Sequence, residues 1–326
     1  MGQPVAIIAS GIGPGTAALC LMEILQCSDY IKEIIWSGTA GYSAQPGGIL
    51  DTTRGCEAAS PSTTVCREGD LCISPFAINW DCKLTDWDQQ CKGFPNVCSY
   101  PTQTYGPEYA FLYGECIFSS YTAADLDLAD ELQAAAEAAA FPARSDALNS
   151  YEELYFNITS NSTGVAYNLT RPPIPWNYSQ CAIADSQFFW AGAPWDMVSR
   201  NFSATLINEA LGLNLTQTDV ITVSSMEDEA VAQVVGRWNA MSTNKQIPYV
   251  MIRAHSDYLQ KPVVRTGNGM WETSPDALPQ NFEDGYPYAI ATGSTAVLTM
   301  LQRRCHATNG VNNAICQYKL AQIFSD

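Results

Sequence analysis

The sequence predicts a single domain with three layers, α/β/α, in which a mixed, twisted central sheet lies between helices. Short β-branched runs such as 220–223 and 247–252 have the composition of buried strands. They alternate with segments whose apolar residues recur at helical spacing, including 123–139 and 289–304. A chain of 326 residues can bury one large core, and neither an internal repeat nor a clear linker divides it.

The amino-terminal part predicts two strands and a helix. Residues 5–9 are interpreted as a buried strand, the glycines of 11–15 as a tight turn and 16–27 as a helix. The turn lacks the acidic residue that follows ~20 residues later in dinucleotide folds, so we interpret it as a close strand-to-helix connection. The next strand, 34–37, ends in small residues that let a ligand approach the backbone. These residues are Gly38, Thr39, Ala40 and Gly41.

Two strands of the carboxyl half deliver polar groups where they end. The strand 220–223 is expected to lead through Ser224 or Ser225, as the helix cap, into a helix that begins with Met226. The strand 247–252 is expected to end just before Arg253. Ligands bind outside the carboxyl ends of strands in open α/β sheets, so four side chains are expected at one crevice. They are Glu227, Arg253, Ser256 and Asp257.

Twelve cysteines are a second signal, and six of them fall within 43 residues. Their spacing contains no Cys-x-x-Cys, and His255 and His306 are the only histidines, so no metal site is predicted. We predict a disulfide-rich insertion over 52–100, whose six cysteines allow 15 pairings. The six are Cys56, Cys66, Cys72, Cys82, Cys91 and Cys98.

Six Asn-x-Ser/Thr sequons indicate a lumenal or extracellular surface. The turn-rich region 141–180 is expected to be an exposed, glycosylated loop. Sequons and cysteines together predict a secreted, secretory-pathway or vacuolar protein. No signal peptide is recognisable at Met1, and we expect that the sequence is incomplete at its amino terminus. The sequons lie at Asn157, Asn161, Asn168, Asn177, Asn201 and Asn214.

The net charge of −17, with a pI near 4.3, argues against binding nucleic acid or an anionic membrane surface. The apolar runs are shorter than the ~18 residues of a membrane span, so none is predicted.

Several motifs resemble, in order, those of the purine nucleoside phosphorylase and nucleosidase superfamily, over roughly half of the chain. An opening strand and helix that family members carry before the first motif is missing from this sequence. Bark and vegetative storage proteins and purine nucleoside permeases, which share the scaffold, are also similar at 226–228 and 256–258. The motifs are 10–18, 34–41, 69–74, Met226-Glu227 and Arg253-Ala254-His255-Ser256-Asp257.

The resemblance implies cleavage of the bond between a purine and its ribose, without a cofactor. Protonation makes the purine a better leaving group, and the resemblance gives this acid role to Asp257. It implies that Glu227 grips the ribose hydroxyls and that Arg253 and Ser256 orient the two carboxylates. Further implied substrate contacts are Met226 under the ribose, Phe188 or Phe189 on the purine, and Gly13, Gly38, Thr39, Ala40 and Gly41.

Several alternatives stay open. Glu227 could merely complete a capping box with Ser224, and Asp257 could form a turn with Arg253 as its ion-pair partner. The sequence does not distinguish a hydrolase from a phosphorylase, for which phosphate is the co-substrate. A nucleoside-binding, transport-associated or storage protein is the non-enzymatic alternative. The chain departs from the family pattern at two positions: Tyr42, where the family usually has Gly, and His255, where it usually has an aliphatic residue. We expect the His255 side chain to point away from the pocket. Family members are generally homo-oligomers, so self-association is a further expectation.

Overall fold

The computed structural model describes residues 5–45, 48, 50–51, 57–58, 64–74, 76–79, 121–123, 125–163, 167–186, 193–242, 245–265, 267, 271–274 and 282–307. The helices are α1 (Pro14–Leu25), a short 3-10 helix (Ser28–Tyr30), α5 (Leu126–Glu137), α6 (Asp146–Thr163), α7 (Ala193–Leu211), α8 (Asp228–Met241) and α9 (Phe282–Ala307). The strands are β1 (Ile34–Tyr42), β2 (Leu50–Asp51), β3 (Glu57–Ala58), β4 (Leu71–Ser74), β5 (Phe76–Asn79), β6 (Tyr121–Ala123), β7 (Pro175–Trp176), β8 (Cys181–Asp185), β9 (Ile221–Ser225), β10 (Tyr249–Tyr258), β11 (Val263–Arg265) and β12 (Trp271–Thr273).

The centre of the molecule is a mixed sheet, which confirms the predicted α/β class. Its strands follow the order β6-β5-β8-β9-β1-β10-β4-β7. β1 pairs in parallel with β10 along its whole length and in antiparallel fashion with β9 near its carboxyl end. The two strands that carry the candidate site, β9 and β10, therefore flank β1.

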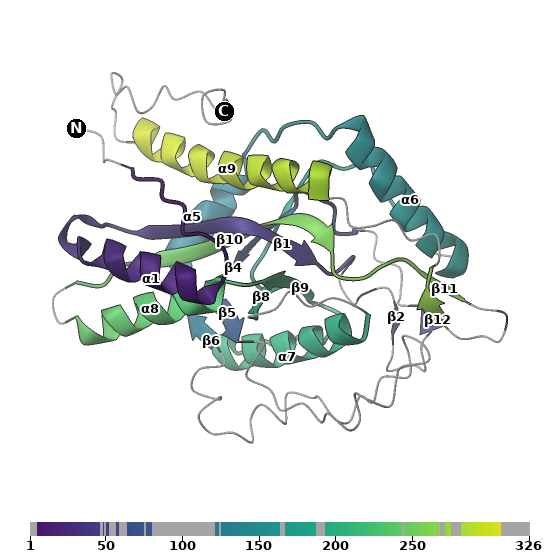
Figure 1. Cartoon of the computed structure of the whole chain (residues 1–326), viewed down its shortest axis with the longest axis horizontal. Helices are drawn as coiled ribbons and strands as arrows, with labels where there is room; N and C mark the ends of the chain where they lie inside the picture. Colours follow the sequence, from purple (N-terminus) through teal and green to yellow (C-terminus); the bar gives the residue numbers. More distant parts are fainter. Residues whose placement is uncertain are drawn as a thin grey trace.

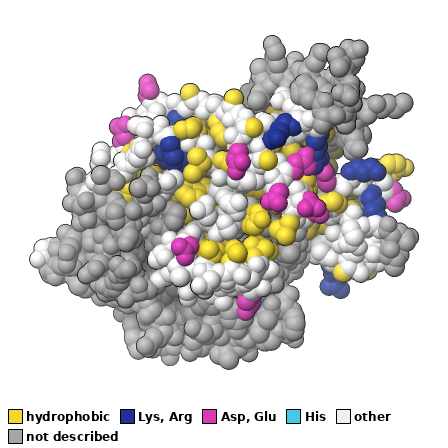
Figure 2. Space-filling model, turned by 180° about the vertical axis from the view of Figure 1, so that it is seen from behind, with side chains coloured by type: hydrophobic (Ala, Val, Ile, Leu, Met, Phe, Trp, Pro, Cys, Tyr) yellow, Lys and Arg dark blue, Asp and Glu magenta, His cyan; other side chains and the backbone are white. Residues whose placement is uncertain are grey.

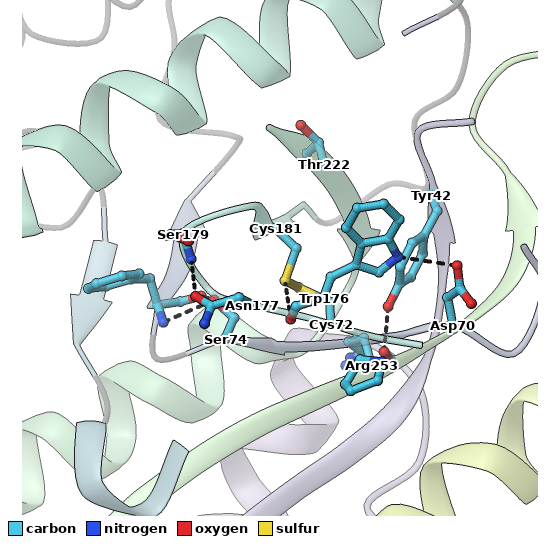
Figure 3. Close-up of a disulfide and its surroundings, with 12 residues drawn as sticks. Tyr42, Asp70, Cys72, Ser74, Trp176, Asn177, Ser179, Cys181, Thr222 and Arg253 are labelled. Carbon is cyan, nitrogen blue, oxygen red and sulfur yellow. Dashed lines mark hydrogen bonds between the residues drawn. A yellow bond between two sulfur atoms is a disulfide. The ribbon is translucent and has the colours of Figure 1, made fainter. Parts of the chain in front are cut away.

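The sheet is rolled, because strands near its two ends are joined. β4 and β5 are one residue apart in the chain, although each is the second strand from opposite ends of the sheet. A disulfide between Cys72 of β4 and Cys181 of β8 spans a Cα–Cα distance of 5.9 Å (Figure 3). Chain and disulfide thus hold together strands that lie far apart in the order of pairing.

Helices cover the sheet on two sides (Figure 1). α1 and α8 lie side by side and pack their apolar residues on one face, whereas α5 and α9 cover the other. α5 shows why such a helix forms: Asp125 caps it by accepting from the Leu128 N–H, and Leu128 and Leu132 face the core at helical spacing. α7 packs against β8 and β9.

The predicted ends of two strands were wrong. β1 continues through the small residues 38–41 as far as Tyr42, and β10 runs past Arg253 to Tyr258. The cause is non-local, since each strand satisfies the backbone hydrogen bonds of the other over this length. Arg253, Ser256 and Asp257 therefore project from a strand rather than from a loop that follows it.

The predicted strand 5–9 was also wrong. Among the described residues, 5–9 form no strand and pair with none of the sheet's strands. Their apolar side chains are exposed, with Ile7 at 82 %.

The region 141–180, expected to be a loop, contains α6 and β7. Glu152, Tyr155 and Phe156 of α6 are buried, so this part of the region belongs to the folded body.

The cysteine prediction is corrected in one respect. Cys72 pairs with Cys181, outside the stretch 52–100, and Cys66 is a buried free thiol. The other four cysteines of that stretch lie outside the described residues, as do Phe188 and Phe189.

The described surface on the back of the molecule mixes acidic, basic and apolar side chains (Figure 2). Among the residues that the structure covers, no helix is long and apolar enough to cross a membrane.

Candidate active site

Glu227 lies between β9 and α8, and its carboxylate is held from two sides. Oε1 accepts a hydrogen bond from the backbone N–H of Gly13 at 2.9 Å, and Oε2 accepts from Nη2 of Arg253 at 2.7 Å. Glu227 is the residue that precedes α8, but its side chain makes no capping hydrogen bond to that helix. The capping-box alternative, with Ser224, is therefore wrong. The side chain keeps 12 % of its surface exposed.

Arg253 reaches from β10 to the start of α8. Nε donates to Oδ2 of Asp228 at 2.7 Å, and Nη1 donates to the carbonyl oxygen of Thr39 at 3.0 Å. Burial by itself lowers the pKa of Arg253, but the charges of Asp228 and Glu227 outweigh it and raise the pKa. The guanidinium is thus a buried cation between two carboxylates, which rules out Arg253 as the ion-pair partner of Asp257 alone.

The start of α8 is capped by Asp185, at the end of β8. Its Oδ2 accepts from the N–H of Glu229 at 3.1 Å, and its Oδ1 accepts from Oγ of Ser225 at 2.7 Å. Burial, and then the charge of Asp228, raise the pKa of Asp185 to about 8. Sequence analysis missed this residue because the cap comes from another strand. Its only signal was a polar residue directly after a buried apolar run.

Asp257 lies near the end of β10 and is 1 % exposed. Oγ of Ser256 is 2.8 Å from Oδ1 of Asp257 and 3.2 Å from the carbonyl oxygen of Ala40. Burial raises the pKa of Asp257 to about 6, and the hydrogen bond from Ser256 offsets part of that rise. At this site the carboxyl group holds its proton closer to neutral pH than an exposed aspartate does.

The two carboxylates belong to two hydrogen-bonded groups that meet on β1. Arg253 donates to the carbonyl of Thr39, and Ser256 donates towards the carbonyl of the next residue, Ala40. Glu227 is linked to this stretch of β1 through Arg253, and Asp257 is linked to it through Ser256. The two carboxyl groups are therefore anchored to the same short stretch of strand. Gly41 lies opposite Asp257 in the register of β1 and β10, and Met226 is half-buried beside Glu227.

The two departures from the family pattern contact each other. The rings of Tyr42 and His255 stack with centroids 4.6 Å apart and planes at 14°. The Tyr42 hydroxyl donates to the carbonyl oxygen of Arg253 (Figure 3). Burial lowers the pKa of His255 to about 4, so the imidazole is neutral at pH 7. His255 is a core residue behind the site, and Tyr42 supports the strand that carries Arg253.

No protein-family model matches this chain, and no curated protein matches it. Solved structures do. The chain is similar to nucleosidases.

One of them is a putative methylthioadenosine nucleosidase from Weissella paramesenteroides, with 17 % identity and a TM-score of 0.39, covering 90 % of this chain and 78 % of that one. Another is the 5′-methylthioadenosine/S-adenosylhomocysteine nucleosidase from Neisseria meningitidis in complex with methylthio-immucillin-A, with 16 % identity, a TM-score of 0.40, and coverage of 90 % and 79 %. A third is futalosine hydrolase from Helicobacter pylori, with 11 % identity, a TM-score of 0.35, and coverage of 90 % and 77 %.

Within the described ranges, no group of three or more His, Cys, Asp or Glu side chains could hold a metal ion.

Proposed function

We propose that this protein binds purine nucleosides and cleaves their N-glycosidic bond, with Asp257 as the acid and Glu227 as the ribose-binding carboxylate. The observation that supports the proposal best is the arrangement on β1. The Glu227 carboxylate is linked through Arg253 to the carbonyl of Thr39, and the Asp257 carboxyl group is linked through Ser256 to the carbonyl of the next residue, Ala40.

Glu227 is suited to binding two neighbouring hydroxyl groups. Gly13 and Arg253 each donate to one of its oxygens, which keeps the carboxylate oriented. A carboxylate has about four lone-pair sites, so each oxygen retains capacity for one further donor. The ribose 2′- and 3′-hydroxyls are such donors. Their hydrogen bonds to an anion would strengthen as positive charge develops on the sugar.

Asp257 is suited to protonating the leaving base. Its buried carboxyl favours the neutral form, and an acid is most effective when its pKa lies near the working pH. Because Asp257 is 1 % exposed, the base would reach it only after the surrounding chain has moved aside on binding. Proton transfer would then occur in a site from which water is excluded.

The test is incubation with inosine or adenosine, with and without inorganic phosphate, followed by detection of the free base. Release without phosphate supports a hydrolase, and release only with phosphate supports a phosphorylase. Asp257→Asn should lower turnover far more than nucleoside binding, because the proton is needed only as the bond breaks. Glu209→Gln, an exposed carboxylate on α7, is the matched control and should leave both unchanged. Equal loss of turnover and binding in Asp257→Asn would contradict the acid role.

The near-complete burial of Asp257 favours one alternative, a protein that binds or stores nucleosides without cleaving them. Measurable binding of inosine with no release of base, at any phosphate concentration, would support this alternative and overturn the catalytic proposal.

We also infer that the protein works in the secretory pathway or outside the cell. The Cys72–Cys181 disulfide supports this inference, since such bonds persist in oxidising compartments. Secretion of the full-length protein from a eukaryotic host, with loss of mass on enzymatic removal of N-glycans, is the expected result. Retention without glycans would contradict it.

A further inference from the structure

A second carboxyl group, that of Glu68, lies buried close to Asp257. Glu68 sits in the turn that leads into β4 and is 0 % exposed. Neither of its carboxyl oxygens has a hydrogen-bond partner among the described residues. A buried ionised carboxylate without partners is strongly disfavoured, so such a group needs an explanation.

The position of this carboxyl group is defined by α9 and β10. A Cβ built at Gly285 of α9 would lie 2.4 Å from the carbonyl oxygen of Ser256 and 3.1 Å from Oε2 of Glu68. The Glu68 carboxyl group and the backbone of Ser256 therefore border the same small space, directly before Asp257 in the strand. Gly285 leaves that space open.

The backbone of Glu68 is held firmly. Its N–H donates to Oε1 of Glu152 at 2.8 Å, and its carbonyl oxygen accepts from Nη2 of Arg144 at 2.9 Å. The next residue, Gly69, donates to the carbonyl oxygen of His255 on β10 at 2.8 Å. The turn is thus fixed against the strand that carries Asp257, while the carboxyl end of Glu68 is left unsatisfied.

Charged groups from four segments act on Glu68, and the Glu68 charge in turn raises the pKa of Tyr258 on β10. The four groups are Glu152 of α6, Asp257 of β10, Asp284 of α9 and Arg144 of the segment before α6. Burial raises the pKa of Glu68 well above its ordinary value, and the three acidic neighbours add to this while Arg144 opposes it. The charge of Asp257 is thus one of those that disfavour ionisation of Glu68, and two buried like charges close together cannot both ionise easily.

We propose that Glu68 and Asp257 form a buried carboxyl pair that holds one proton in common, and that Glu68 thereby keeps part of the Asp257 population in the acid form as the pH rises. Glu68 is a positioning residue that acts through Asp257. The catalytic part of the proposal rests on the proposed function, whereas the pairing itself does not.

The protons balance over one turnover. Asp257 gives its proton to the base as the bond breaks and the bonding electrons pass to the base. Because the pair held a single proton, both carboxyl groups are then ionised until a proton returns. The nucleophile, water or hydrogen phosphate, loses its O–H proton on bonding to the sugar, and this proton returns to the pair.

Coupled titration gives the pair a distinctive pH profile. Between its two macroscopic pKa values the pair carries one proton, and the fraction of that proton on Asp257 is constant. Cleavage by the wild type should therefore fall as the pH rises through about 6 and then reach a plateau. A lone Asp257 would instead lose its acid form by about tenfold for each further pH unit.

The experiment compares wild type with Glu68→Gln, which keeps the shape but cannot release a proton, between pH 5 and 9. The variant should match the wild type at pH 5 and lose kcat by about tenfold per unit above 6, with KM unchanged. Glu68→Leu, which removes the unsatisfied oxygens, guards against a folding defect and should lose the plateau as well. Glu153→Gln, an exposed neighbour of Glu152 on α6, is the control. A plateau that persists in both Glu68 variants would overturn the proposal.

A second measurement does not depend on activity. The free energies of unfolding of wild type, Glu68→Gln, Asp257→Asn and the double variant form a double-mutant cycle at pH 8. A shared proton predicts that the two substitutions are not additive. Additivity would overturn the pair even if Asp257 is the catalytic acid. Conversely, non-additivity in a protein that releases no base would uphold the pair and reject only the proposed function.

Discussion

The guanidinium of Arg253 lies against the backbone of Gly38. A Cβ built at Gly38 would be 2.2 Å from Nη1 and 2.8 Å from Cζ of Arg253, which real Cβ atoms do not tolerate. The absence of a side chain at this position of β1 therefore allows Arg253 to reach Glu227, Asp228 and the Thr39 carbonyl at once.

Substitution of Gly38 by Ala should displace the guanidinium and loosen Glu227. We expect destabilisation of about 1–3 kcal/mol, the range found for overpacked sites, together with weaker nucleoside binding. Urea unfolding and calorimetric titration with inosine measure the two effects. Gly15→Ala in α1, where a Cβ meets no atom within 4 Å, is the control and should not weaken binding. If Gly38→Ala left both stability and nucleoside affinity unchanged, the position of Arg253 would not depend on the absence of a side chain at residue 38.

Glu227→Ala should separate sugar recognition from base recognition. Arg253 keeps Asp228 as a partner, so the variant should fold. Loss of a charge-assisted hydrogen bond corresponds to about 1.5–3 kcal/mol, so nucleoside affinity should fall by about tenfold or more. Affinity for free adenine or hypoxanthine should stay the same.

Isothermal titration with nucleoside and base checks this expectation, and Glu23→Ala, an exposed residue of α1, serves as its control. Equal losses for nucleoside and base would rule out the ribose-binding role of Glu227.

Asp257→Asn should stabilise the protein at high pH. The folded state raises the pKa of Asp257 to about 6, above the value of ~3.9 in an unfolded chain. The stability that the protonated carboxyl contributes is complete below pH ~3.9 and is lost as the pH rises through about 6. Asn cannot ionise, so the variant should gain up to about 3 kcal/mol relative to wild type at pH 8, and little at pH 4.

Urea midpoints at pH 4, 6 and 8 measure this difference. Asp130→Asn, an exposed aspartate of α5, should show none at any pH. A loss of stability in Asp257→Asn that is independent of pH would contradict a raised pKa.

Sequence analysis predicted the elements that depend on local pattern. The helices α5 and α9 lie where apolar spacing and flanking residues indicated. The predictions were wrong where pairing between segments distant in sequence determines the local structure. Small residues at 38–41 favour a turn locally, but parallel pairing with β10 keeps them extended. The apolar run 5–9 favours a strand but finds no partner in the described sheet.

In the candidate site, too, residues in local motifs were predicted, whereas residues that act on distant segments were not. The motifs named Glu227, Arg253, Ser256 and Asp257, although the last three lie within β10 and not after it. Neither Asp185 nor Glu68 could be found in this way, because each acts on a segment that is distant in sequence: Asp185 on the start of α8 and Glu68 beside Asp257. Likewise, the stacking of Tyr42 on His255 joins residues of two different strands.

Loss of the Cys72–Cys181 disulfide should cost considerable stability. The bond closes a loop with a sequence separation of 109 residues. By the chain-entropy account, a loop of this length corresponds to roughly 3–5 kcal/mol. In the double variant Cys72→Ser/Cys181→Ser the free energy of unfolding from urea denaturation should be lower by this amount, and reduction of the wild type should have a similar effect. Cys27→Ser, a free and exposed thiol, should leave the midpoint unchanged. Equal midpoints for the double variant and wild type would show that the rolled sheet does not need the bond.

The same bond joins the second strand from one end of the sheet to the third strand from the other, with β9, β1 and β10 between them. While it is intact, neither half of the sheet can peel away independently to admit solvent to these three strands. Their amide hydrogens should therefore exchange with deuterated water only through rare opening of the entire molecule, and reduction of the bond should permit exchange from one side.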